Sequence, residues 1–145
     1  MQYSDVAKLQ TVTAGGDRPK VADYYGRVRV ACIDTKLTAA DNKILLVKLP
    51  AGRIRILSSS RVTGTLATGT TTIKIGYPAY TKIDGTTQEA DDDALMSATA
   101  ASSVSGKALN DLVIESKSGV DIEAVLSANG AANDTINGFI QFVVD

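Results

Sequence analysis

The stretch PAGRIRIL, residues 50–57, decides the fold class. Pro50 fixes the backbone φ angle and Gly52 tolerates a positive φ, so the start of this stretch predicts a tight turn. After the turn, Arg53 and Arg55 alternate with two isoleucines. A period of two is typical of a strand with one buried and one exposed face. We therefore expect a strand whose isoleucines face a core and whose arginines face outward.

The same period of two recurs along most of the chain. In GRVRVACID, residues 26–34, it predicts that Arg27 and Arg29 point outward and that three apolar residues face the core: Val28, Val30 and Cys32. Gly138, near the C-terminus, indicates a bulge or a close approach of two backbones. Strands are predicted over eight segments: residues 26–34, 44–49, 53–58, 61–66, 71–77, 112–116, 120–127 and 136–144.

Residues 91–98, DDDALMSA, break this period. Acidic residues suit the N-terminus of a helix, because they accept hydrogen bonds from free N–H groups and oppose the positive end of the dipole. We expect one short helix over residues 92–100, in the connection between strands five and six. Three carboxylates could instead bind Ca²⁺ or Mg²⁺. The adjacent side chains of Asp91, Asp92 and Asp93 point in different directions, so the helix start is the favoured interpretation.

Eight short strands without a βαβ rhythm predict an all-β protein, a jelly-roll-like β-sandwich. A chain of 145 residues is long enough for one such domain, which we assign to residues 26–145. Residues 1–25 are weakly patterned, although Leu9, Thr11 and Thr13 alternate with their neighbours. Two interpretations of this segment remain open: an N-terminal arm that docks on a neighbouring subunit, and an edge strand of the same domain.

Composition excludes several kinds of chemistry. The sequence contains no His, no Trp and one Cys. Acid–base catalysis by His, activation of a Ser or Cys nucleophile by His, and most transition-metal sites are therefore not expected. We predict no catalytic, cofactor-binding or metal-binding residues. A net charge of −1 and the lack of a long apolar run give no reason to expect nucleic acid or a membrane as a partner.

Charge is unevenly distributed along the chain. Residues 1–61 hold 11 basic and 5 acidic residues, whereas residues 62–145 hold 4 basic and 11 acidic ones. Arginine is favoured at protein interfaces, where it binds carboxylates in bidentate fashion. The candidate protein-interaction residues are accordingly Arg27, Arg29, Arg53 and Arg55. The alternative is that the two halves interleave on folding and the charges mix into an ordinary surface.

Seven segments within residues 26–145 are notable together: GRVRVA (26–31), LVKLPAGRIRIL (46–57), SRV (60–62), IGYPAY (75–80), DGT (84–86), ADDDAL (90–95) and NGFIQFVVD (137–145). Over about residues 26–145 they resemble the head decoration (capsid cement) proteins of tailed bacteriophages. The resemblance implies a jelly-roll-like domain that binds the capsid shell and ties neighbouring major capsid proteins together. No functional motif of that family can be assigned to particular residues.

The favoured functional prediction is a non-enzymatic virion protein on the outer surface of a phage head, made in the host bacterial cytoplasm. Its expected partners are the major capsid protein and further copies of itself, as a trimer ahead of a dimer, because decoration sites lie on symmetry axes or between capsomers. The N-terminal arm and the arginine face are the expected contacts. The alternative is a carbohydrate- or receptor-binding jelly-roll module on the virion surface, for which the five tyrosines could supply contacts.

Overall fold

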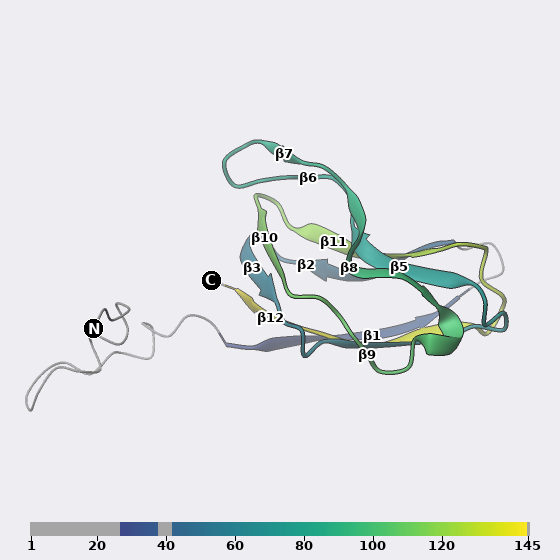
Figure 1. Ribbon diagram of the computed structural model, residues 1–145. Coiled ribbons are helices and arrows are strands. Elements are labelled where there is room, and N and C mark those ends of the chain that lie inside the picture. Colours follow the sequence, from purple (N-terminus) through teal and green to yellow (C-terminus); the bar gives the residue numbers. More distant parts are fainter. Residues whose placement is uncertain (1–26, 38–41, 145) are drawn as a thin grey trace, which may run out of the picture.

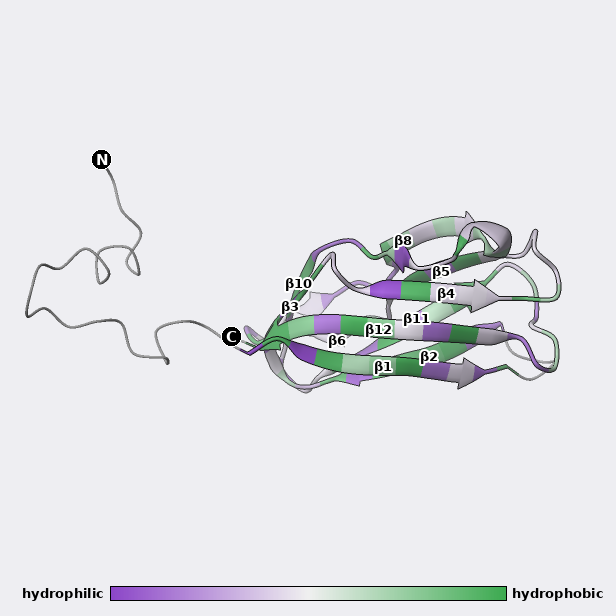
Figure 2. Ribbon diagram, turned by 90° about the horizontal axis from the view of Figure 1, so that it is seen from below, coloured by the Kyte–Doolittle hydropathy of each residue, from purple (hydrophilic) through white to green (hydrophobic). Residues whose placement is uncertain are grey.

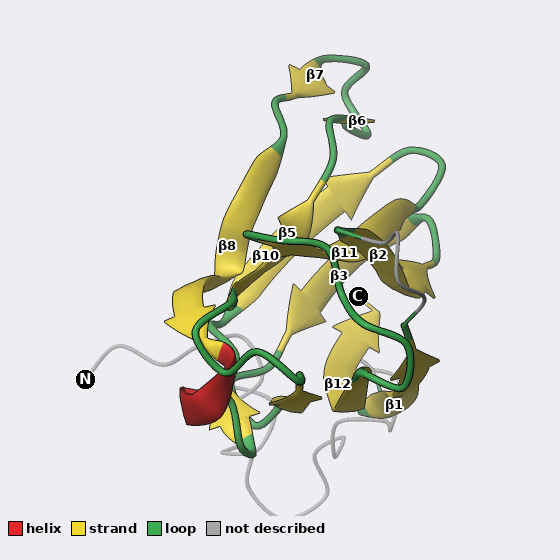
Figure 3. Cartoon of the chain, turned by 90° about the vertical axis from the view of Figure 1, so that its right-hand side faces the viewer, coloured by secondary structure: helices red, strands yellow, loops and turns green. Residues whose placement is uncertain are grey.

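The computed structural model describes residues 27–37 and 42–144, which form two antiparallel sheets packed face to face (Figure 1). Sheet A contains β1 (Arg29–Lys36), β3 (Gly52–Ile56), β4 (Arg61–Thr65), β9 (Lys107–Ala108), β10 (Leu112–Ser116) and β12 (Thr135–Val144). Sheet B contains β2 (Lys43–Leu49), β5 (Thr72–Tyr77), β8 (Asp91–Ala100) and β11 (Val120–Leu126). A small hairpin, β6 (Tyr80–Thr81) and β7 (Thr87–Gln88), projects from the sandwich between β5 and β8. One turn of 3₁₀ helix, η2 (Ala101–Ser103), follows β8 (Figure 3).

The order of the strands is that of a jelly roll. β3 and β4 lie end to end beside β12, and β10 and β9 continue one another in the same way along β3 and β4. Sheet A therefore has four rows, in the order β1, β12, β3–β4 and β10–β9, and sheet B has the order β2, β11, β5, β8. Successive rows alternate between the two sheets except at β5 and β8, which are neighbours. The predicted all-β, jelly-roll-like sandwich is confirmed.

Ser60 lies in the gap between β3 and β4 and connects the two strands into one row. The backbone N–H of Leu57 donates to the carbonyl of Gln141 at 2.9 Å, as in an ordinary ladder. The N–H of Gln141 instead donates to the side-chain oxygen of Ser60 at 2.9 Å, and Ser60 is fully buried. One hydroxyl thus replaces a backbone acceptor, so two strands that the sequence separates form one row.

The core lies between the sheets and is mainly aliphatic. Both isoleucines of the PAGRIRIL stretch, Ile54 and Ile56, are fully buried, as their alternation with arginine predicted. Facing residues from sheet B, such as Ile75 and Ile122, are fully buried as well. Burying one such side chain contributes about 1.5–3 kcal/mol, so the two apolar faces hold the sheets together.

The predicted helix over residues 92–100 is wrong, because this segment is strand β8. It pairs antiparallel with β5 through two register shifts, and it buries Leu95 and Met96. Without β8, the N–H and C=O groups along one side of β5 would be unpaired, so the sheet outweighs a local preference for helix. Gly76 makes the pairing possible, since an added Cβ there would lie 2.0 Å from the carbonyl oxygen of Asp91.

The predicted orientation of the first strand is also wrong. Val28 and Val30 are each 55% exposed and Cys32 is exposed, whereas Ile33 and Leu37 are buried. The two larger apolar side chains occupy the core, and the period of two then turns the valines and the cysteine outward. Cys32 is therefore not a core residue.

Residues 1–25, for which we expected an N-terminal arm or an edge strand, lie outside the described residues. Across residues 27–37 and 42–144, no helix has the length and apolar character needed to cross a membrane.

Candidate interaction surface

The outer face of sheet A carries exposed valines from three rows. Val28 and Val30 lie on or beside β1, and Val113, which is 46% exposed, lies on β10 at the other side of the sheet. Val143 of β12 is partly exposed and lies opposite Arg55, which in turn lies opposite Val113. We call Val28, Val30, Val113 and Val143 the sheet A patch. Figure 2 views the sandwich from this side, with β1, β12 and β4 in front.

The predicted arginines do not all share this face. Arg53 and Arg55 of β3 are exposed on it, on the side of the strand opposite the buried isoleucines. Arg53 forms an ion pair with Glu115 of β10 at 3.6 Å. Arg29 and Arg27 are exposed too, but they have the parity of Ile33 and lie where β1 begins, at the end of the sandwich. The fold thus brings together two of the four arginines, with the sheet A patch around them.

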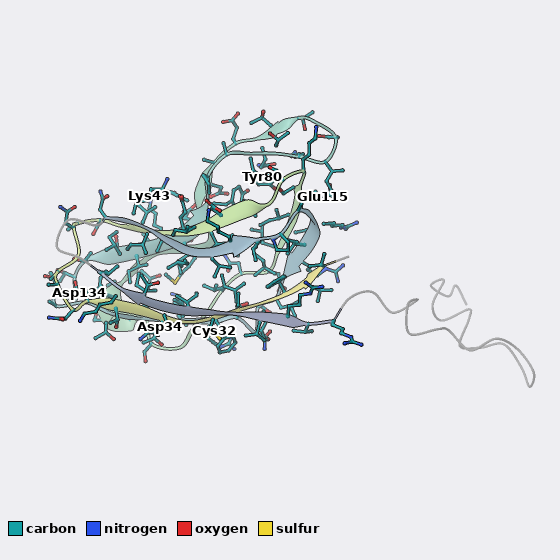
Figure 4. The ribbon with its side chains drawn as sticks, turned by 180° about the vertical axis from the view of Figure 1, so that it is seen from behind. Cys32, Asp34, Lys43, Tyr80, Glu115 and Asp134 are labelled. Atoms are coloured by element: carbon teal, nitrogen blue, oxygen red, sulfur yellow. The ribbon has the colours of Figure 1, made fainter. Side chains whose placement is uncertain are left out.

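The outer face of sheet B has a different chemistry. Acidic and basic residues of adjacent strands form ion pairs across it, and its one strongly exposed large apolar residue among those described is Leu45, at 44%. The pairs are Lys43–Glu123 at 2.8 Å, Lys74–Asp92 at 3.4 Å and Lys48–Asp121 at 4.0 Å. Paired charges on an exposed face are typical of a solvated surface. Figure 4 shows Lys43 on this side of the sandwich, with Cys32 and Asp34 on the opposite side.

In the folded protein, basic and acidic residues are unevenly divided between the two sheets. The strands of sheet A carry six basic and two acidic residues, whereas those of sheet B carry three basic and five acidic ones. Both halves of the sequence contribute to both sheets, as the interleaving alternative predicted. Folding nevertheless gives one net positive and one net negative sheet, which the split along the sequence did not indicate.

The β6–β7 hairpin is a second exposed feature. Its turn is held by Thr86, whose N–H and hydroxyl both donate to the carboxylate of Asp84 at 2.9 and 2.6 Å. These hydrogen bonds lower the pKa of Asp84. The adjacent Ile83 is 55% exposed.

The base of the hairpin packs on sheet A. The N–H of Lys117 donates to the carbonyl of Thr81 at 2.9 Å, and Lys82 forms a β-bridge with Ser116. The rings of Tyr77 and Tyr80 meet edge to face with their centres 5.4 Å apart. Burial raises the pKa of both tyrosines. Sequence reasoning missed this hairpin, although the DGT turn at residues 84–86 was a usable signal.

The described residues contain no group of three His, Cys, Asp or Glu side chains that could hold a metal ion. Asp91, Asp92 and Asp93 begin β8, where a hydrogen bond with Asp91 raises the pKa of Asp93. A depression of about 300 Å³ lies nearby on sheet B, between Tyr77 and the Lys43–Glu123 ion pair. Its two carboxylates, Asp92 and Glu123, each form an ion pair with a lysine.

No protein-family model matches the sequence, and no curated protein matches it either. Two solved structures have a similar fold. One chain belongs to the acidic stable capsid structure of Helicobacter pylori bacteriophage KHP30; the TM-score is 0.51 at 17% identity, over 83% of this chain and 90% of that one. The other belongs to the cyanophage Pam1 capsid asymmetric unit, with a TM-score of 0.48 at 15% identity over the whole of both chains. The likeness to the KHP30 chain shows a shared fold.

Proposed function

We propose that this protein is a non-enzymatic virion structural protein that decorates a phage head. It binds the outer surface of the shell and stabilises contacts between major capsid protein subunits. The observation that carries the proposal is the contrast between the two outer faces of the sandwich. The outer face of sheet A combines exposed valines with a net positive charge, whereas the outer face of sheet B has one strongly exposed leucine among the described residues and carries three ion pairs.

The chemistry of the sheet A patch supports docking through that face. Isolated apolar side chains are normal on protein surfaces, but several exposed apolar side chains on one face are typical of interaction sites. Arg55 lies between Val113 and Val143 in the sheet register. An arginine among apolar side chains is a frequent component of interface hot spots. The net positive charge of the sheet favours an acidic surface on the capsid protein.

The alternative of a sugar-binding module has less support. Carbohydrate sites of this kind use exposed aromatic rings, but of the two tyrosines within the described ranges, Tyr77 is buried and Tyr80 is only partly exposed. Each ring also packs against the other.

Binding to phage heads tests the proposal. Purified protein is mixed with heads assembled from the major capsid protein of the same genome, and cosedimentation and cryo-electron microscopy follow. We expect density on the outside of the shell. Heads that never acquire exterior density at saturating protein would refute the proposed function.

Matched variants test the docking face. Val113→Glu places a negative charge in the sheet A patch, and Leu45→Glu makes the same kind of change on the outer face of sheet B at nearly equal exposure. Burying an unpaired carboxylate at an interface costs at least about 1.4 kcal/mol, so Val113→Glu should weaken head binding by tenfold or more. Leu45→Glu should bind as the wild type does. Equal loss in both variants would show that sheet A is not the docking face.

A further inference from the structure

Strand β1 forms an open edge of sheet A. It pairs with β12 over eight consecutive residue pairs, from Arg29 with Phe142 to Lys36 with Thr135, without a register shift. No other strand in the described ranges pairs with it, and Figure 2 shows β1 as the outermost ribbon of its sheet. In an antiparallel strand, the N–H and C=O groups of every second residue point away from the partner. β1 therefore presents a regular row of backbone donors and acceptors.

The other three edges of sheets A and B, within the described residues, are protected. β2 is bulged against β11 and carries Lys43 and Lys48. β8 has two register shifts and begins with three aspartates. The β10–β9 row is interrupted at residues 109–111, and Lys82 covers its end at Ser116. Bulges, charges, interruptions and covering segments are the usual means of preventing edge-to-edge pairing, and β1 has neither a bulge nor an interruption.

Charge along β1 is confined to its ends. Residues 30–33, Val-Ala-Cys-Ile, are uncharged, with Arg29 before them and Asp34 and Lys36 after them. Parallel pairing of two copies would bring Arg29 beside Arg29. Antiparallel pairing places the two Arg29 residues at opposite ends of the paired segment, so it avoids this contact between like charges.

We propose that β1 is a self-association edge, which pairs antiparallel with β1 of a second copy about a two-fold axis. Of the described strands, only β1 offers a regular and unprotected edge, so the strand of a second copy that fits it is β1 itself. The two A sheets join into one continuous sheet. Outer-face residues must then pair with outer-face residues, which brings Val30 and Cys32 of the two copies together.

This pairing gives a closed dimer and not the trimer that the symmetry argument favoured. It also doubles the docking face, because the outer faces of the two A sheets then form one continuous surface. The inference concerns self-association alone, and it is tested on purified protein without capsids.

Hydrogen exchange of the wild-type protein gives the first test. Analytical ultracentrifugation across a dilution series measures the monomer–dimer equilibrium, and exchange is measured at both ends of the series. We expect a dimer at high concentration, in which the outward-pointing amides of β1 are protected, and a monomer on dilution, in which these same amides exchange fast. A monomer at all concentrations would overturn the inference, and so would protection of β1 that does not change with concentration.

Charged variants give the second test. Cys32→Lys places like charges near the two-fold axis at an exposed position, whereas Val113→Lys places the same charge on the same face but away from β1. Like charges on paired strands are destabilising, so Cys32→Lys should weaken the dimer by roughly tenfold. Cys32→Ser and Val113→Lys should dimerise as the wild type does. Equal dimerisation of Cys32→Lys and wild type, or loss with Val113→Lys alone, would refute pairing through this edge.

Discussion

Substituting Gly138 by alanine tests how closely β12 and β4 approach each other. Gly138 lies opposite Val62 in the ladder and has a φ of 146°, a value that residues with a side chain rarely adopt. A Cβ added there would lie 2.1 Å from the carbonyl oxygen of Arg61 and 2.9 Å from the Cα of Val62. Both neighbours are backbone atoms, so the clash is relieved only by moving one strand.

The expected loss has two parts. A side chain held in this backbone region costs about 1–3 kcal/mol. Separating the strands weakens two or so ladder hydrogen bonds, at about 1 kcal/mol each. We expect Gly138→Ala to lower the free energy of unfolding by about 3–5 kcal/mol, a large part of the 5–15 kcal/mol that such a domain has.

Gly85→Ala is the matched control. Gly85, in the β6–β7 turn, has a φ of 87° but no atom within 4 Å of an added Cβ, so it bears the backbone cost without the clash. Urea unfolding gives the free energy of unfolding of both variants. If this free energy falls with urea concentration at the same slope in both, the difference between the unfolding midpoints reports the difference in stability. Gly138→Ala should lose about 2 kcal/mol more than Gly85→Ala, by the hydrogen-bond cost above. Equal losses would refute the close approach of β12 and β4.

Three further predictions concern buried polar groups. Ser60→Ala leaves the N–H of Gln141 without its acceptor, so urea unfolding should show a loss of about 1–3 kcal/mol, with Ser58→Ala, at an exposed position nearby, as the control. Asp134 is buried and accepts hydrogen bonds from the N–H groups of residues 67 and 131 at 2.8 and 2.7 Å; Asp134→Ala should therefore lose more stability than Asp134→Asn, which keeps one acceptor oxygen. Burial and then the charge of Asp91 raise the pKa of Tyr77 in the folded protein. That contribution to stability is present below the ordinary value of 10.0 and is lost as pH rises through the folded pKa, so Tyr77→Phe should flatten the alkaline fall in the urea midpoint; an unchanged profile would contradict this.

The alternation of apolar and polar residues predicted most of the strands, because it indicates which side of a segment is buried. All eight predicted segments form strands of the sandwich, and PAGRIRIL has the predicted orientation. The sandwich has eight rows of strands, the same number as the predicted strands, but the two sets of eight are not the same. Segments 53–58 and 61–66 form a single row, since the Ser60 hydroxyl bridges the gap, and the segment predicted as a helix is the missing row.

The β8 error has a tertiary cause. Local propensity records how a segment behaves alone, whereas β8 is stabilised by its ladder with β5 and by the burial of Leu95 and Met96. Only Arg53 and Arg55, of the four candidate residues, lie on the face with the apolar patch. That grouping depends on the register of β3 with β10 and β12, which no local pattern encodes.

The wrong orientation of β1 is itself informative about function. Its segment carries apolar residues on both faces: Val28, Val30 and Cys32 on one, Ala31 and Ile33 on the other. A strand that packs against the core with one face needs apolar residues on that face only. In most natural strands the sequence pattern agrees with the side that the fold buries. Departures from that agreement are expected where a residue serves a contact outside the fold. The fold buries Ile33 and leaves the face with Val28, Val30 and Cys32 exposed on the described sandwich, and we expect a partner surface to cover that face.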